Sequence, residues 1–359
     1  FVFGSAAEAT YLSNSYYSTT LAREFNAVVA ENAMKFASIE PTNGGFDWAA
    51  SDTLVQFAKD HTMTMRGHTM VWHTDQGVPT WLRNISDPAD VDAALKNHIE
   101  KVMTHFKDAP IKYWDVVNEA INNDNKYSNS TDIIDLSDIN NTSNTAIDSY
   151  LRKDLAHQSP NSSDPSFWYE RLGSAYIAKA FQYTRDSADA NGNTNVKLFY
   201  NDYGCEGSGD KFTALYDLVK KLKASGVPID GVGFQMHIEG SLFGDGITGW
   251  PSIASLKDNI EKITDLGLEV HITELDVRFD TPITDANLAR QQQIYHDIIA
   301  ACLANPKVTA IMVWGFTDAH SWISQNPTIF PGKGSALIFD TNYNAKPAYY
   351  GVQNALDGK

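Results

Sequence analysis

The feature that most restricts the fold of this chain is a regular alternation of short strand-like segments with amphipathic helical stretches. Eight segments are rich in β-branched and aromatic residues: Phe1–Gly4, Ala27–Ala30, Thr64–Val71, Lys112–Asn118, Val196–Asn201, Gly231–His237, Glu269–Thr273 and Ala310–Phe316. The stretches between them carry apolar residues at three- and four-residue spacing, as in Asp90–Phe106, Tyr169–Ala190 and Asp285–Leu303. Such alternation indicates parallel β-α units, and closing eight of them leaves no strand edge exposed. We therefore expect an α/β fold in which residues 1–359 form one (β/α)8 TIM barrel.

One connection is much longer than a minimal βα loop, which needs only a few residues. Residues from about 121 to 168 are rich in Asn, Ser, Thr and Asp and contain one candidate short helix, Ile133–Ser149. The barrel is thus expected to carry an enlarged loop after its fourth strand. This insertion either shapes one end of a cleft or is an inert glycosylated decoration. No Ser/Thr/Pro/Gly-rich linker is visible, so we expect no appended binding module.

The charge of the chain restricts its partners. A net charge of -16 and a pI near 4.9 argue against nucleic acid, which requires a basic footprint, and against anionic membrane surfaces. No run of about 18 apolar residues is present, so no membrane span is expected. A neutral substrate suits such a surface. The aromatic content of 11% fits sugar rings as well as core packing.

The environment of the protein is indicated by sequons and cysteines. Five N-x-S/T triplets favour a secreted, extracellular glycoprotein: Asn84, Asn129, Asn140, Asn141 and Asn161. Phe1–Gly4 already has the pattern of a strand, so the sequence is expected to be a mature form. Cys205 and Cys302 are too far apart for a disulfide to be inferred, and neither has metal-type spacing. We expect a monomer with no metal and no cofactor.

Two of the strand-like segments end in an acid. Lys112–Ala120 reads K-Y-W-D-V-V-N-E-A and ends in Asn118 and Glu119, and E-V-H-I-T-E-L-D-V places Glu274 after a similar apolar run. A single glutamate of this kind is more often a solvated strand-end charge. Two of them, on the fourth and seventh strands, would face each other across the barrel mouth, where such barrels place their chemistry. A pair of carboxylates flanking one bond is what glycoside hydrolysis requires.

The sixth strand-like segment adds two further polar residues. G-V-G-F-Q-M-H places Gln235 and His237 on one side of a strand, and the same period of two places Asp115 with Glu119. We therefore expect His237 to bridge Glu274 and Asp115 and to fix the charge state of Glu274. The alternative is a core histidine with its hydrogen bonds satisfied.

The third strand-like segment ends in R-G-H-T-M-V-W-H and carries His68 and Trp72. A zinc site is not expected here, because the H-E-x-x-H pattern and a matched third ligand are missing. Hydrogen bonds from His68 to sugar hydroxyls and a stacking face on Trp72 fit better.

Seven motifs in the same order make the chain resemble glycoside hydrolase family 10, the retaining endo-β-1,4-xylanases, in its fungal type. Besides the segments above, they include A-E-N-A-M-K-F, L-F-Y-N-D-Y and V-W-G-F-T-D-A-H-S-W. The resemblance covers the chain nearly end to end. It implies a (β/α)8 barrel that cleaves internal bonds of xylan and xylo-oligosaccharides with retention.

The resemblance also implies a role for individual residues. Glu119 would be the acid/base and Glu274 the nucleophile, Asn118 would bond the sugar 2-hydroxyl, and Gln235 and His237 would orient Glu274. The non-reducing side would be lined by Glu31, Asn32, Lys35, His68, Trp72, Trp314 and Trp322. Tyr203 would lie on the leaving-group side.

Three positions depart from the family pattern. The family usually has a glutamine three residues after the tryptophan that matches Trp72, but this chain has Asp75 there and Gln76 next. It usually has an arginine directly after the second cleft tryptophan, but Ile323 follows Trp322 here. Cys302 matches one half of a disulfide common in fungal members, but Lys307 occupies the other half. Two alternatives remain: a cellulase or mixed xylanase/glucanase of the same clan, and a catalytically silent sugar-binding barrel.

Overall fold

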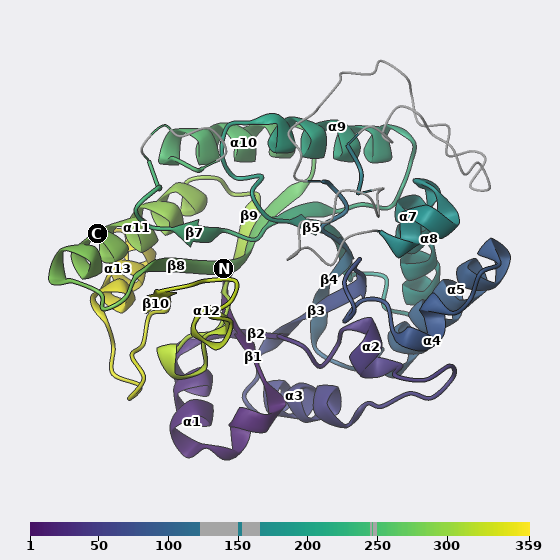
Figure 1. Cartoon of the computed structure of the whole chain (residues 1–359), viewed down its shortest axis with the longest axis horizontal. Helices are drawn as coiled ribbons and strands as arrows, with labels where there is room; N and C mark the ends of the chain where they lie inside the picture. Colours follow the sequence, from purple (N-terminus) through teal and green to yellow (C-terminus); the bar gives the residue numbers. More distant parts are fainter. Residues whose placement is uncertain (123–149, 153–165, 245, 247–249) are drawn as a thin grey trace. The chain divides into compact units, whose positions relative to one another are not determined.

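A computed structural model of the chain describes residues 1–122, 150–152, 166–244, 246 and 250–359. Most of the insertion, including the candidate helix Ile133–Ser149, lies outside these ranges. The described chain divides into two compact units. Unit 1 contains Phe1–Val29, Tyr203–Phe212 and Gly233–Lys359, and unit 2 contains Ala30–Asp202 and Thr213–Val232. Each unit alternates strands with helices, as the sequence predicts (Figure 1).

The strands of unit 1 form a mostly parallel sheet. β9 (Val308–Val313) pairs in parallel with β1 (Val2–Ala7) and with β8 (Glu269–Asp280), in a register that sets Ser5 opposite Val313. β8 also pairs in parallel with β7 (His237–Glu239) and antiparallel with the short β10 (Lys333–Gly334). The side chains of β1, β8 and β9 are almost all buried, which is expected for parallel strands covered on both faces.

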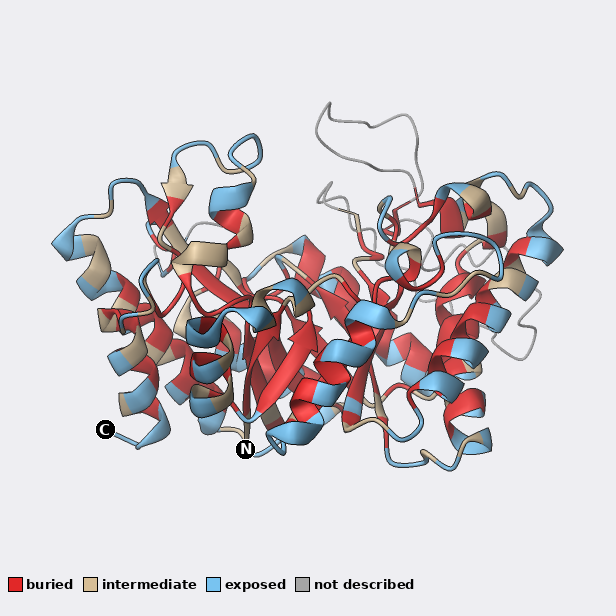
Figure 2. Ribbon diagram, turned by 90° about the horizontal axis from the view of Figure 1, so that it is seen from below, coloured by how far each residue is buried: buried red, intermediate tan, exposed pale blue. Residues whose placement is uncertain are grey.

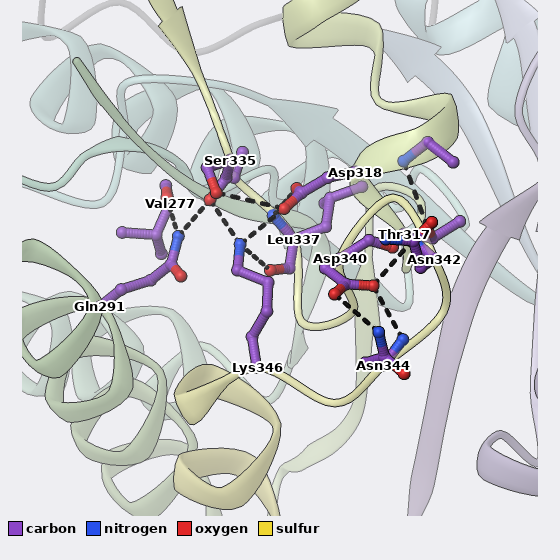
Figure 3. A network of polar contacts seen from close by, with 12 residues as sticks. Val277, Gln291, Thr317, Asp318, Ser335, Leu337, Asp340, Asn342, Asn344 and Lys346 are labelled. Carbon is purple, nitrogen blue, oxygen red and sulfur yellow. Dashed lines mark hydrogen bonds and ion pairs between the residues drawn. The ribbon is translucent and has the colours of Figure 1, made fainter. Parts of the chain in front are cut away.

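The helices of unit 1 follow its strands. They are α1 (Ser15–Glu24), α10 (Ile253–Asp265), α11 (Asp285–Leu303), α12 (Trp322–Gln325) and α13 (Pro347–Leu356), with the short 3-10 helices η1 (Ala9–Ser13) and η2 (Asp318–His320). α10 begins at a capping box in which Ser252 and Ser255 bond each other's backbone N–H. α11 and α13 lie side by side (Figure 1). Gln291, on the inner face of α11, donates to the carbonyls of Val277 and Ser335 and so attaches this helix to the end of β8 (Figure 3).

Unit 2 is built on three parallel strands. β3 (Thr64–Val71) pairs with β4 (Ile111–Asn118), and β4 pairs with β5 (Lys197–Asp202), which sets Asn118 opposite Asn201. Its helices are α2 (Phe36–Ile39), α3 (Ala49–Asp60), α4 (Thr80–Arg83), α5 (Pro88–His105), α7 (Phe167–Leu172) and α8 (Ala175–Ala190). β2 (Ala27–Ala30), β6 (Gly231–Phe234) and α9 (Asp210–Ala224) span the boundaries between the units.

α5 shows how the sequence pattern produces these helices. Asp87 caps it by accepting the Ala89 N–H at 2.8 Å, and Pro88 occupies the first turn, where no backbone N–H is needed. Its buried residues recur on one stripe: Val91, Leu95, His98, Ile99, Val102 and Met103. Figure 2 shows the same division throughout, with buried strands and with helices that bury one face and expose the other.

The strand expected over Glu269–Thr273 extends to Asp280, so Glu274 lies within β8 and not at its end. Two other predicted elements are divided in the structure. The single helix expected over Tyr169–Ala190 is two helices, because Gly173 adopts φ 59° and ends α7. The strand expected over Gly231–His237 is likewise divided into β6 and β7 at Met236, which adopts φ 64°. Both breaks depend on a left-handed backbone that hydrophobic periodicity does not reveal.

The remaining tests of the sequence concern membranes and cysteines. Among the described residues, the structure contains no helix long and apolar enough to cross a bilayer. Within the same ranges, Cys205 and Cys302 are buried thiols rather than halves of a disulfide. Lys307 stands where the resemblance implies the second cysteine of the disulfide, and its ammonium group donates a hydrogen bond to the Thr264 carbonyl.

Candidate active-site residues

Glu119 lies one residue beyond β4, in unit 2, and both its backbone and its side chain are held. Its N–H donates to the Asn201 carbonyl at 2.9 Å, and its own carbonyl accepts Arg152 Nε at 2.7 Å. Trp72 Nε1 donates to Oε2 at 2.8 Å, and Asn118 Nδ2 donates to Oε1 at 3.1 Å. The residue adopts φ 58°, so the strand alternation that would align its side chain with Asp115 ends before it. The carboxylate is half-buried and oriented by two donors.

The residues beneath Glu119 extend this network. Asn118 is buried, and its Oδ1 accepts Asn201 Nδ2 at 2.8 Å, which aims the amide hydrogens of Asn118 at Glu119. The start of the insertion pairs with a later part of it, since Ile121 and Leu151 form an antiparallel bridge and Arg152 N–H donates to the Ala120 carbonyl. Arg152 is thereby brought to the Glu119 carbonyl. No pattern in the sequence indicates this arginine, because it lies 33 residues downstream of Glu119 and outside any predicted helix or strand.

Asp115 does not have the role expected for it. It is buried and pairs with Arg66, while its Oδ2 also contacts His68 Nδ1 at 3.0 Å. Burial disfavours its charged form, but Arg66 and His68 outweigh burial and hold the pKa of Asp115 below its usual value. Arg66 stands in the quoted R-G-H-T-M-V-W-H motif, yet an inward-pointing arginine on a buried strand was not recognised there. Asp115 and Arg66 form a buried ion pair that orients His68.

A further group of predicted sugar-binding residues follows β2 in unit 2. Lys35 Nζ bonds Asn32 Oδ1 at 2.6 Å and Gln76 Oε1 at 2.8 Å, and it lies 4.8 Å from the centroid of the Trp72 ring. Glu31, half-buried, is the first residue after β2. The contact to Gln76 shows how the chain accommodates Asp75, which is exposed and pairs with Arg83. Gln76, the residue after Asp75, supplies the side-chain amide that binds Lys35.

Glu274 lies within β8, in unit 1, and is buried. Its backbone N–H donates to the Gln235 carbonyl at 3.0 Å, and its Oε2 lies 3.1 Å from His237 Nε2. The other ring nitrogen of His237 contacts Asp276 Oδ2 at 2.7 Å. The prediction that His237 contacts Glu274 is therefore confirmed, and the prediction that it also bridges to Asp115 is wrong. Both ring nitrogens of His237 are occupied by carboxylates of β8.

The charge of His237 follows from these contacts. Burial opposes the imidazolium, but the carboxylates of Asp276 and Glu274 outweigh burial and raise the pKa of His237 to about 10. His237 is thus a cation at neutral pH, lying between two acids. Asp276 was missed in the sequence, although it follows Glu274 by two residues and so shares its face of β8. The two-residue spacing between Glu274 and Asp276 is the sequence pattern that indicates this partner of His237.

The two predicted tryptophans of unit 1 lie beside this group. Trp322 Nε1 donates to Asp276 Oδ2 at 2.8 Å, and its ring lies 4.8 Å from the His237 ring. Trp314 is 7% exposed and packs in a core cluster with Ala6 and Met312. Tyr203, at the start of the loop after β5, is half-buried, with Lys211 Nζ 3.6 Å from its ring centroid. The roles of these residues toward sugar stay predictions.

Comparison with known proteins identifies the family of the chain. The model of the family described as glycosyl hydrolase family 10 matches residues 1–355. Endo-1,4-beta-xylanase 2 of Aureobasidium pullulans is 35% identical over 337 residues, which are 93% of this chain and 80% of that protein.

Solved structures give the same result. Native xylanase 10B of Thermotoga maritima aligns with a TM-score of 0.80 at 33% identity, over 99% of this chain and 95% of that one. Xylanase 10B of Thermotoga petrophila RKU-1, solved with xylobiose, aligns with a TM-score of 0.81 at 34% identity, over 99% and 94%. The predicted (β/α)8 barrel is confirmed. The chain belongs to glycosyl hydrolase family 10 and is a glycoside hydrolase.

Proposed function

We propose that this glycoside hydrolase is a retaining endo-1,4-β-xylanase, with Glu119 as acid/base and Glu274 as nucleophile. The observation that carries the proposal is the different support given to these two acids. Glu119 receives neutral donors from Trp72 and Asn118, whereas Glu274 contacts the cation of His237. Each carboxyl group is thus held in one orientation by neighbouring side chains, as a group that acts on a bound substrate must be. The related xylanases from Aureobasidium and Thermotoga support xylan as the substrate class.

The proposed reaction is a double displacement. Protonated Glu119 gives its proton to the departing glycosidic oxygen while Glu274 attacks the anomeric carbon and forms a glycosyl-enzyme. Ionised Glu119 then takes a proton from water, which attacks the same carbon and releases the sugar with retained configuration. Retention requires the two carboxyl groups about 5–5.5 Å apart when they act on one bond.

The supporting residues have separate tasks in this scheme. Trp72 and Asn118 fix the carboxyl group of Glu119 so that it faces the leaving oxygen. His237 contacts Oε2 of Glu274 and so orients its carboxylate, and Asp276 holds His237 in turn. Lys35, Asn32 and the Trp72 ring present polar and aromatic contacts suited to a xylose unit. We further propose that the protein acts as a secreted monomer with one catalytic barrel, on the basis of its sequons and uniform composition.

Two measurements test the proposal. Hydrolysis of xylan is compared with hydrolysis of carboxymethyl-cellulose, and the anomers released first from xylohexaose are identified by proton NMR. We expect xylan to be the better substrate and the β-anomer to appear first. Faster hydrolysis of the cellulose derivative would overturn the substrate class, and an initial α-anomer would overturn the mechanism.

Variants then assign the two acids. Glu274→Ala should lose nearly all turnover on every substrate, because no nucleophile remains. Glu119→Ala should lose turnover on xylan but keep the first step on aryl xylobiosides with activated leaving groups, which need no proton. The matched control is Glu269→Ala, which removes the acid at the first residue of β8 and should leave turnover unchanged. A Glu119→Ala variant equally inactive on both substrate types would contradict its assignment.

A further inference from the structure

A buried acid outside the two groups described above supports the backbone that carries Gln235 and His237. Glu206 lies in the loop after β5 and is 2% exposed. Its Oε1 accepts the N–H of Met236 at 2.8 Å. Asn259 of α10 fixes this loop from the other side, since its Nδ2 donates to the carbonyls of Cys205, Glu206 and Gly207 at 3.3, 3.2 and 3.0 Å. The acid is therefore held rigidly with one oxygen on a single buried N–H.

Met236 is a strained point in the chain. It is fully buried, adopts φ 64° without being a glycine, and separates β6 from β7. A side-chain-bearing residue persists in this left-handed conformation only where surrounding contacts fix it. Its N–H cannot join a strand ladder at the break, so it needs another acceptor, and Glu206 supplies one.

The backbone carbonyls of Gln235 and Met236 accept hydrogen bonds from the backbone N–H groups of two acids on β8. The Gln235 carbonyl accepts the Glu274 N–H at 3.0 Å, and the Met236 carbonyl accepts the Asp276 N–H at 3.3 Å. The next residue, His237, contacts the side chains of the same two acids. A rotation of the peptide between Gln235 and Met236 would therefore move His237 and the support of Glu274 together.

We propose that Glu206 is a positioning residue of the hydrolase, which fixes the left-handed turn at Met236 and through it the contact between His237 and Glu274. The part of this proposal that concerns turnover rests on the assignment of Glu274 as nucleophile. The part that concerns His237 does not depend on any activity. Burial raises the pKa of Glu206, whereas its backbone donors and the nearby Lys211 and His237 lower it by less. Burying this carboxyl group therefore costs free energy, which agrees with a structural contact at Met236.

The test compares three variants. Glu206→Leu fills most of the space of the side chain and removes the acceptor, and Glu206→Gln keeps one oxygen for the Met236 N–H. Glu40→Leu is the matched control, because Glu40 is also a buried glutamate, accepts the Gly44 N–H at 3.0 Å, and pairs with His98 in unit 2. The active fraction of each preparation is counted by intact mass after reaction with a 2-deoxy-2-fluoro-xylobioside, so that misfolded protein does not enter the rate.

We expect kcat per active molecule on aryl xylobiosides to fall about 100-fold in Glu206→Leu, the loss typical of a small misplacement of reacting groups. KM should change little, because the sugar contacts proposed for Asn32, Lys35 and Trp72 lie outside this network. Glu206→Gln should recover most of the loss. Glu40→Leu should lower Tm without changing kcat per active molecule.

A spectroscopic readout separates failure of this proposal from failure of the proposed function. The 15N signals of the His237 imidazole, assigned through the His237→Gln variant, should move in Glu206→Leu and return toward wild type in Glu206→Gln. Unchanged His237 signals in a folded Glu206→Leu variant would overturn the positioning role, whatever the substrate proves to be. A Glu206→Leu variant with wild-type kcat per active molecule would overturn it as well.

Discussion

Replacing His237 by glutamine removes a cation that two carboxylates hold in place, and the effect on stability should depend on pH in a defined way. The pKa of His237 rises from 6.5 to about 10 because Asp276 and Glu274 outweigh the penalty of burial. A rise of this size corresponds to roughly 5 kcal/mol of additional stabilisation of the protonated ring in the folded state. The histidine is 14% exposed, so solvent screens these contacts only weakly.

The sign follows from proton binding. Between pH 6.5 and about 10 the folded protein keeps the proton on His237 while the unfolded chain has lost it. The stabilisation is therefore fully present below pH 6.5 and is lost as pH rises through about 10, by about 1.4 kcal/mol per pH unit. The difference in free energy of unfolding between wild type and His237→Gln should shrink with this slope.

The assay is urea unfolding of both proteins at several pH values from 6 to 10, with the difference taken at each pH so that other titrating groups cancel. His98→Gln serves as the control. His98 is also buried and pairs with a glutamate, but burial outweighs Glu40 and lowers the pKa of His98, so its difference should stay level above pH 6.5. A His237→Gln difference that is equally level over this range would refute the reasoning, since it would mean that His237 is neutral in the folded protein.

Three further predictions concern other described contacts. Trp72→Phe removes the donor to Glu119 and should lower kcat/KM on xylan about 10- to 100-fold. Glu119 becomes charged as it gives up its proton in the first step, and a hydrogen bond to a charged group contributes about 1.5–3 kcal/mol. Steady-state kinetics that show no change would contradict this contact. Lys346→Met leaves the buried Asp318 without its cationic partner and should lower the free energy of unfolding by about 3–5 kcal/mol (Figure 3). For an unfolding entropy near 0.75 kcal/mol/K, calorimetry should show a Tm lower by about 4–7 °C. The double variant Lys346→Met/Asp318→Leu should recover most of that Tm, and a double variant less stable than the single one would contradict the explanation.

Much of the fold could be predicted because hydrophobic periodicity fixes which segments are strands and which are helices. The observed β2 and β3 begin and end at the predicted residues, and α11 does so as well. The errors arose where a single backbone conformation, rather than a pattern, decides the structure. Gly173 divides one predicted helix, and Met236 divides one predicted strand.

The candidate site shows the same limit. The sequence indicates Glu119 and Glu274 because each follows an apolar, strand-like run, and it indicates His237 through its spacing from Gln235. It does not reveal that His237 pairs with Asp276 or that Asp115 pairs with Arg66, because partners on separate strands depend on register and on the choice between several nearby acids. The acceptor role of Glu206 is beyond sequence reasoning for the same reason.

The most direct test of the account is to identify the residue that becomes covalently attached to sugar. The protein is treated with 2,4-dinitrophenyl 2-deoxy-2-fluoro-xylobioside, digested, and analysed by mass spectrometry. A double displacement predicts one fluoroxylobiosyl group per molecule, on the peptide that contains Glu274, and the same label on the Glu119→Ala variant because this leaving group needs no proton. A label on any other residue, or no label together with release of sugar of inverted configuration, would contradict the account.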